Sequence, residues 1–187
     1  MSSRFERVGS ETLYEGKFFG VRKEVFRHED GEHAEREIVV HTGAVGIVAL
    51  DGERLWFVRQ PREAIGAPDL LEIPAGKLDE EGEEPQETAE RELAEEIGKQ
   101  ADNWESLGSF YTSPGFTNEQ VHLFLATGLS DVEERPEVHE NERIDVEVRP
   151  LEHLELLIAE STDSKTIIGL ARLQALLAEQ GRLPPAD

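Results

Sequence analysis

The sequence predicts an α/β fold in which a mixed β-sheet carries a helix on each side and a small β segment precedes it. A near-continuous apolar run at Ala44–Leu50 is typical of a strand buried on both faces, and helical patterns follow after Pro85 and after Ser164. In 187 residues we expect one main domain over 43–183. The segment over 1–42 has few residues for a core of its own, so we expect it to pack on the main domain or on another subunit.

The N-terminal segment is predicted to form short strands. Apolar residues alternate in Phe18–Phe26, a turn signal follows at Glu29–Glu32, and apolar character returns in Arg36–His41. This pattern favours strands joined by tight turns.

Turn residues bound the strands that precede the first helix. Asp51-Gly52 separates Ala44–Leu50 from Leu55–Val58, and it is a strong hairpin signal because both residues tolerate positive φ. Residues 60–70 contain two prolines and a glycine and are predicted to form a loop. Leu70–Pro74 is then a short strand that the proline ends.

The first helix is expected to begin near Pro85, which suits the first helical turn, and to end at Gly98. Its buried stripe recurs every four residues, at Ala89, Leu93 and Ile97. The remaining elements are predicted as strands at 104–111, 121–129 and 144–148, an acidic loop at 130–143, a short helix at 151–159, and a longer helix that Ser164 caps and Gly181 ends.

The composition excludes several classes of protein. Acidic residues number 41 and basic residues 19, which gives a formal net charge of −22. This balance argues against a protein that coats nucleic acid or docks on anionic membranes, since both need clustered Lys and Arg. The absence of cysteine excludes disulfides, zinc thiolates and thiol nucleophiles. No apolar run approaches the ~20 residues that span a bilayer, so we expect a soluble cytoplasmic protein.

Acidic residues are concentrated along the first helix. Glu84 and Glu87 lie at its start, where the helix dipole favours acids, and we interpret them as capping residues. Glu92, Glu95 and Glu96 lie in its last turns, where the dipole disfavours them. A divalent cation such as Mg²⁺ or Mn²⁺ would compensate this charge, whereas the alternative is a solvated acidic face. Arg91 can pair with Glu95 four residues on and orient its carboxylate.

These residues resemble the Nudix box of nucleoside-diphosphate-linked hydrolases. The matching positions are Gly76, Glu83, Arg91-Glu92-Leu93, Glu95-Glu96 and Gly98. The spacing from Gly76 to Glu83 is longer than usual by one residue, and Lys99 stands where an apolar residue is usual. The insertion precedes the helix and should leave its register intact. The resemblance implies a Nudix-type α/β/α sandwich.

Further segments resemble the ADP-ribose pyrophosphatase branch of this family: Gln60-Pro61-Arg62, Leu71–Gly76, Ser113–Glu119 and Glu140–Glu142. The resemblance implies hydrolysis of ADP-ribose to AMP and ribose 5-phosphate with two or three Mg²⁺ ions, Mn²⁺ being possible. The implied metal ligands are the carbonyl of Ala75 and the side chains of Glu92, Glu95, Glu96 and Glu142.

The resemblance also implies roles outside the metal site. Either Glu140 or Glu142 orients or deprotonates the attacking water, and spacing does not separate them. Arg62 is an implied phosphate contact, and the Ser113–Glu119 segment implies substrate contacts at Ser113, Gly115 and Glu119. From the residues alone, Pro114-Gly115 is typical of a type II turn.

The branch is usually a dimer whose N-terminal strands cross to the partner. The resemblance therefore implies a homodimer with a swapped N-terminal segment, in which Phe19 and Arg36 serve the partner's adenine site. Two alternatives stay open: a Nudix hydrolase of another nucleoside diphosphate sugar or dinucleotide, and a Nudix-fold module that binds ADP-ribose without cleaving it.

Overall fold

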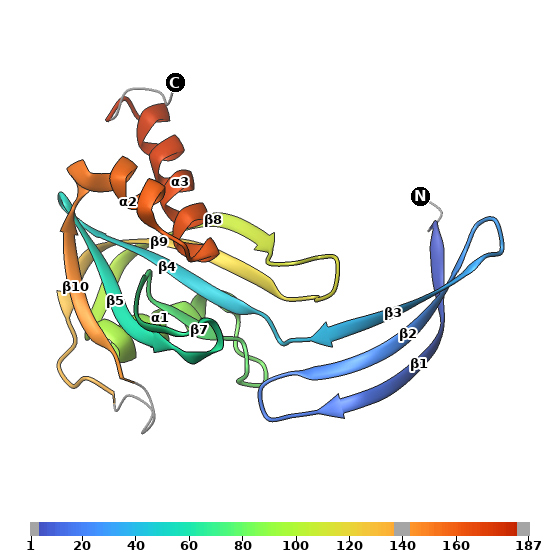
Figure 1. Cartoon of the computed structure of the whole chain (residues 1–187). Coiled ribbons are helices and arrows are strands. Elements are labelled where there is room, and N and C mark those ends of the chain that lie inside the picture. Colours follow the sequence, from blue (N-terminus) through green and yellow to red (C-terminus); the bar gives the residue numbers. More distant parts are fainter. Residues whose placement is uncertain (1–3, 137–142, 183–187) are drawn as a thin grey trace. The chain divides into compact units, whose positions relative to one another are not determined.

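The computed structural model describes residues 4–136 and 143–182 (Figure 1). The chain divides into two compact units. The first contains the residues up to Gly43 together with Phe110–Gln120, and the second contains Ala44–Ser109 and the residues from Val121 onward. The predicted base candidates Glu140 and Glu142 lie outside the described residues.

A three-stranded antiparallel sheet forms most of the first unit. Its strands are β1 (Phe5–Glu15), β2 (Gly20–His28) and β3 (His33–Val40), in that order. The predicted turn after β2 is confirmed: the N–H of Gly31 donates to the carbonyl of His28 at 3.0 Å, and Gly31 has a φ of 87°. Glycine adopts this left-handed conformation without the strain that a Cβ would add.

Large apolar side chains of β1 and of the turn after it are exposed, whereas those of β2 and β3 are half-buried. The exposed ones are Phe5, Val8, Leu13, Tyr14, Phe18 and Phe19. One buried charge stands out: the carboxylate of Glu24, 7% exposed, accepts a hydrogen bond from Arg7 at 2.9 Å. The sheet therefore leaves apolar surface uncovered within the single chain, which is unfavourable in water.

The segment 110–120 joins this sheet through the backbone of β3. Val39 donates to the carbonyl of Phe116 at 2.8 Å, and Asn118 donates to the carbonyl of Val39 at 3.4 Å. The expectation of a type II turn at Pro114-Gly115 is wrong, because Gly115 does not have a positive φ. Instead, the carbonyl of Ser113 accepts from both Phe116 and Thr117, as in one turn of a helix.

The second unit is built on a seven-stranded mixed sheet, whose central order is β10-β5-β4-β9-β8. The strands are β4 (Ala44–Asp51), β5 (Arg54–Arg62), β6 (Ala67–Glu72), β7 (Ala75–Lys77), β8 (Lys99–Tyr111), β9 (Gln120–Asp131) and β10 (Asp145–Pro150). The pair β4–β9 is parallel, whereas β4–β5, β4–β7, β5–β6 and β5–β10 are antiparallel. The predicted mixed sheet is confirmed.

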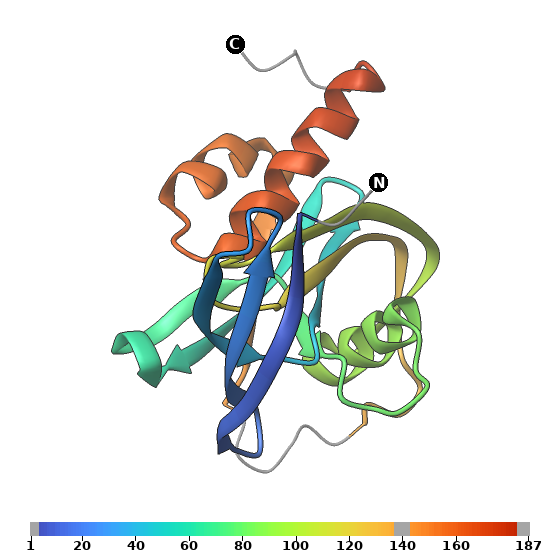
Figure 2. The ribbon, with the colours of Figure 1, turned by 90° about the vertical axis from the view of Figure 1, so that its right-hand side faces the viewer.

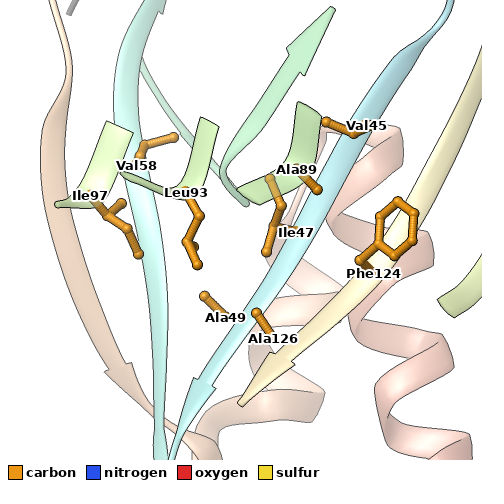
Figure 3. Close-up of a cluster of buried hydrophobic side chains, with 9 residues drawn as sticks. All are labelled: Val45, Ile47, Ala49, Val58, Ala89, Leu93, Ile97, Phe124 and Ala126. Atoms are coloured by element: carbon orange, nitrogen blue, oxygen red, sulfur yellow. The ribbon is translucent and has the colours of Figure 1, made fainter. Parts of the chain in front are cut away.

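Helix α1 (Pro85–Ile97) covers one face of this sheet. It buries Ala89, Leu93 and Ile97, the predicted stripe, in a cluster with alternate residues of β4 (Figure 3). The helix begins with a capping box between Glu84 and Glu87, as predicted, and ends at Gly98 with a φ of 66°. The members of the cluster are Val45, Ile47, Ala49, Val58, Ala89, Leu93, Ile97, Phe124 and Ala126.

Helix α3 (Ser164–Glu179) packs on β4 at the opposite face, and α2 (Leu154–Glu160) packs against α3. Figure 2 shows strands of this unit between α1 and the α2–α3 pair. A Cβ on Gly169 would lie 3.0 Å from Cγ2 of Val48, so the helix backbone approaches β4 closely through a glycine. Because Val48 alternates with Ile47 along β4, the two helices lie on the two faces of one sheet. The predicted α/β/α sandwich is confirmed.

Two local expectations are wrong. Residues 60–70 are not one loop, because β5 runs to Arg62, a short 3₁₀ turn (Glu63–Ile65) follows, and β6 begins at Ala67. The cap of α3 is Asp163 rather than Ser164, since the carboxylate of Asp163 accepts from the N–H of Thr166 at 3.0 Å.

A second 3₁₀ turn (Leu151–His153) precedes α2. No helix within 4–136 and 143–182 is long and apolar enough to cross a membrane.

Candidate active site

Arg91 lies at the centre of the acidic residues of α1. Its guanidinium donates to Glu83 at 3.1 and 3.2 Å and to Glu92 at 2.9 Å. The predicted pair with Glu95 is confirmed at 3.4 Å. The hydrogen bond with Glu83 and the charges of Glu92 and Glu95 raise the pKa of Arg91 above its ordinary value, although partial burial opposes the rise. Arg91 thus fixes three carboxylates at once.

Glu96 connects this helix to the strand that carries Ala75. Its side chain is buried, with 4% exposed, and its Oε2 accepts from the N–H of Ala75 at 2.9 Å. Ala75 is held in turn by the sheet, because β7 pairs with β4 and the preceding carbonyl of Pro74 accepts from Ile47 at 2.8 Å. Two predicted metal ligands, the Ala75 backbone and Glu96, are therefore in contact.

We call Glu83, Glu92, Glu95 and Glu96 the α1 carboxylate cluster. Three of these carboxylates contact Arg91, and the fourth, Glu96, is buried and accepts from Ala75. The hydrogen bond from Arg91 lowers the pKa of Glu83. Carboxylate oxygens are the ligands that Mg²⁺ and Mn²⁺ prefer, and a divalent cation would compensate their negative charge. The residue types present therefore suit such a cation by their chemistry.

The cluster is held by protein contacts. Over 4–136 and 143–182, no three acidic or histidine side chains converge as a group that could hold a metal ion. The reason is visible in the contacts: Arg91 lies between Glu92 and Glu95, and Glu96 turns to Ala75. The remaining predicted ligand, Glu142, lies outside the described residues.

A second arginine side chain, that of Arg135, contacts the C-terminal end of α1. Arg135 donates to the carbonyl of Glu95 at 3.1 Å and to the carbonyl of Glu96 at 2.5 Å. These carbonyls carry the partial negative charge of the helix end, where α1 has no basic residue of its own. Arg135 therefore stabilises the turn from which Glu95 and Glu96 project.

Arg62, the predicted phosphate contact, pairs with a buried carboxylate. Its Nε and Nη2 donate to the two oxygens of Glu72 at 2.6 and 2.7 Å. Glu72 is 1% exposed, whereas the side chain of Arg62 is 42% exposed. A third residue, Lys165 at the start of α3, forms an ion pair with the same carboxylate.

The predicted substrate contacts of the first unit are brought together only in part. A cavity of about 280 Å³ in this unit is lined by Arg36 of β3 and by Gly115, with aromatic rings of Phe5, Phe26 and Phe116. The lining does not include Phe19, whose ring lies 5.8 Å from that of Tyr14, nor Ser113.

Glu119 is held by side chains of its own unit. One of its oxygens accepts from the hydroxyl of Thr112 at 2.7 Å, and the other lies 3.7 Å from Nδ1 of His41. Nδ1 of His41 also accepts from the N–H of Gly43 at 3.0 Å. The carboxylate therefore has a defined orientation within the first unit.

The sequence interpretation missed Glu72, Lys165 and Arg135. For Glu72 a signal was present, since a carboxylate within the apolar run Leu70–Pro74 must find a cation if the strand is buried. Lys165 and Arg135 gave no such signal, because their partners lie far away in the sequence.

Both the sequence and the fold of this chain are similar to those of known proteins. A family model described as NUDIX domain matches residues 40–169. A Mycobacterium tuberculosis protein named ADP-ribose pyrophosphatase is 47% identical over 139 residues, which cover 74% of this chain and 66% of that protein. A Bacillus subtilis protein of the same name is 40% identical over 178 residues, covering 94% and 95% of the two chains. A solved structure described as "Crystal structure of ADP compounds hydrolase" has the same fold, with a TM-score of 0.84, 23% identity and coverage of 97% and 98%.

Proposed function

The chain belongs to the NUDIX domain family, and from this premise we propose that it hydrolyses the pyrophosphate of ADP-ribose to AMP and ribose 5-phosphate with Mg²⁺. The α1 carboxylate cluster carries the proposal, because it gathers the carboxylate oxygens through which a metal-dependent diphosphate hydrolase binds its cations. The names of the two curated relatives support ADP-ribose as the substrate.

Enzymes of this family generally use a divalent metal. We propose that Glu92, Glu95, Glu96 and the carbonyl of Ala75 hold two or three Mg²⁺ ions, with Glu142 as a further ligand and Mn²⁺ as a substitute. When bound, these ions reverse the local charge and lower the pKa of bound water. The contact between Glu96 and Ala75 at 2.9 Å supports this assignment, since it brings a side-chain oxygen and the β7 backbone together.

Other residues take the remaining roles. Arg91 orients the carboxylates of Glu92 and Glu95, which its present contacts support. Arg62 binds the diphosphate through a planar, charged donor group. We propose either Glu140 or Glu142 as the base that activates water.

We propose that the first unit contributes substrate contacts and a dimer interface. Ser113, Gly115 and Glu119 contact the substrate, and Arg36 and Phe19 serve the adenine of the substrate bound by the partner subunit. The cavity lined by Arg36 and three aromatic rings supports a planar, polar-edged ligand. The exposed apolar residues of β1 and of the turn that follows it support burial against a second copy. A monomeric molar mass at micromolar concentration would contradict the dimer.

The function is tested by AMP release from ADP-ribose in the presence of Mg²⁺, for the wild type and for Glu96→Gln. We expect turnover by the wild type and a loss of about 100-fold or more in the variant, the scale seen when one transition-state charge contact is removed. Equal rates in the two proteins would overturn the metal assignment. Glu105→Gln on β8 is the matched control, since Glu105 is exposed and outside the cluster.

A substrate panel separates the alternatives. Faster cleavage of another nucleoside diphosphate sugar or of a dinucleotide would keep the chemistry and replace ADP-ribose as the substrate. Tight binding of ADP-ribose without metal-dependent turnover would mean a binding module instead of an enzyme.

A further inference from the structure

Glu72 is a carboxylate that the proposed reaction does not use directly, yet it is fully buried and paired with two cations. It ends β6, receives both Nε and Nη2 of Arg62, and also pairs with Lys165. Burial alone would raise the pKa of Glu72, but the hydrogen bond from Arg62 and the charge of Lys165 outweigh it and lower the pKa. The carboxylate is therefore held in its charged form, which a buried acid without cations would not be.

The pairing fixes the plane of the Arg62 guanidinium. Two parallel hydrogen bonds at 2.6 and 2.7 Å join two donors of Arg62 to the two oxygens of Glu72, a geometry that allows little rotation. A guanidinium has five N–H donors, so donors that do not face Glu72 are left on a side chain that is 42% exposed. Arg62 thus has one edge against a buried anchor and another available to a ligand.

The anchor is rigid because α3 holds the same stretch of chain. Lys165 contacts Glu72 and also lies 3.1 Å from Asp163, the cap of α3. The next residue, Thr166, is buried, and its hydroxyl accepts from the N–H of Ile73 at 2.9 Å. The start of α3 therefore fixes both the side chain of Glu72 and the backbone that follows it.

This stretch leads directly into the α1 carboxylate cluster. Two residues beyond Ile73, the N–H of Ala75 donates to Glu96. The hydrogen bond with Glu72 raises the pKa of Arg62, and the negative charges of Asp163 and Glu96 act in the same direction although partial burial opposes them. Arg62 thus lies close enough to the cluster for the charge of Glu96 to interact with its guanidinium.

We propose that Glu72 is a positioning residue that, together with Lys165, holds the guanidinium of Arg62 in the orientation in which its free edge binds the diphosphate of the substrate. The inference rests on the proposed function and assigns Glu72 and Lys165 no contact with the reacting atoms. The proposal requires that Glu72 affects substrate binding only through Arg62.

A double-mutant cycle tests this dependence. We expect Arg62→Ala to lower kcat/KM for ADP-ribose by about 10–100-fold, the range for a charged hydrogen bond to phosphate. Glu72→Gln removes the charge and the two-point anchor, and we expect KM to rise about tenfold while kcat changes less than about threefold. In the Arg62→Ala background, Glu72→Gln should have no further effect on KM. Multiplicative effects of the two changes would overturn the proposal, because Glu72 would then act by another route.

Controls separate positioning from general loss of structure. Glu147→Gln removes a carboxylate of β10 that pairs with Arg59, a residue on the same strand as Arg62. This variant should leave kcat/KM within about twofold. If Glu72→Gln does not fold, the cycle is run with Lys165→Met, which leaves the Arg62–Glu72 contact in place. That variant should raise KM about threefold with Arg62 present and not at all with Arg62→Ala. An equal change in both backgrounds would overturn the proposal.

A different experimental result would contradict the proposed function and leave the positioning role open to test. A wild type that does not cleave ADP-ribose contradicts the function, and the same cycle is then measured on the dissociation constant of inorganic pyrophosphate with Mg²⁺ by calorimetry. Coupled effects of Glu72→Gln and Arg62→Ala on that constant support the positioning role. Independent effects, or no effect of Arg62→Ala, contradict it.

Discussion

The backbone of Gly76 lies directly against the side chain of Glu92. A Cβ at position 76 would lie 2.1 Å from both Cδ and Oε1 of Glu92, far inside contact distance. Gly76 does not have a positive φ, so space and not backbone conformation requires a glycine here. The strand that carries Ala75 and the helix that carries Glu92 can approach each other only at a residue without a side chain.

Gly76→Ala should therefore displace the carboxylate of Glu92. We expect kcat to fall about 100-fold, because a misplaced ligand of this kind costs roughly two orders of magnitude. The measurement is ADP-ribose turnover at saturating Mg²⁺, with circular dichroism to verify the fold. Gly9→Ala is the control, since its Cβ would meet Val25 at an ordinary 3.5 Å. Full activity of Gly76→Ala would mean that Glu92 need not occupy this position.

Arg91→Lys tests the fork geometry of the guanidinium separately from its charge. An ammonium group cannot bridge Glu83, Glu92 and Glu95 together, so we expect kcat to fall about 10–100-fold while the net charge of the cluster is unchanged. Turnover of the variant against the wild type at several Mg²⁺ concentrations checks this. A wild-type rate in the variant would show that charge alone suffices.

The stability of the protein should depend on pH through Glu72. The pKa of Glu72 in the folded protein lies below its ordinary value of 4.5, so the unfolded chain takes up the proton first as the pH falls. The stability that Glu72 contributes is therefore fully present above pH 4.5 and is lost as the pH falls through the lower, folded pKa. We expect Glu72→Gln to lower the free energy of unfolding by about 3 kcal/mol at pH 7, the low end for breaking a buried ion pair.

Urea unfolding at pH 7 and at steps below pH 4.5 measures this difference. The gap between the wild type and Glu72→Gln should shrink on acidification, whereas Glu105→Gln should track the wild type at every pH. A gap that stays constant down to pH 2 would contradict a charged Glu72 in the folded state.

Arg135→Ala should loosen the last turn of α1. Loss of two hydrogen bonds to the carbonyls of Glu95 and Glu96 should cost about 1 kcal/mol of stability, as charges at a helix end typically do. Because both glutamates are proposed metal ligands, the Mg²⁺ concentration for half-maximal activity should rise about threefold or more. Arg182→Ala, which removes a surface contact to Glu53 at 3.7 Å, is the control and should change neither quantity.

Local patterns predicted α1 well because its information is local. Glu84, Glu87 and Gly98 fix its ends through neighbouring backbone groups, and the Arg91–Glu95 pair follows from helical spacing. The same holds for the buried strand β4, whose apolar run needs no partner to be recognised.

The missed features depend on distant partners. β6 contains Pro68 and Asp69, which disfavour strands, and it forms because β5 offers an edge to pair with. The apolar run around Glu72 indicates that this carboxylate needs a cation, but it does not identify Arg62 or Lys165, which lies 93 residues away, as the partner. The ligand geometry of the α1 carboxylate cluster was equally unpredictable, since Arg91 competes for the oxygens that the spacing made available.

The parallel pairing of β4 with β9 has a consequence for how the protein reaches its native state. β4 is formed early in the chain, but its partner from Val121 to Thr127 is synthesised only after α1 and β8. Closing so long a loop costs conformational entropy before the stabilising contacts between the two strands have formed. Proteins with such topologies refold in milliseconds to seconds. Until β9 arrives, one edge of the most apolar strand stays open, so this interval is when a nascent chain is most prone to aggregate.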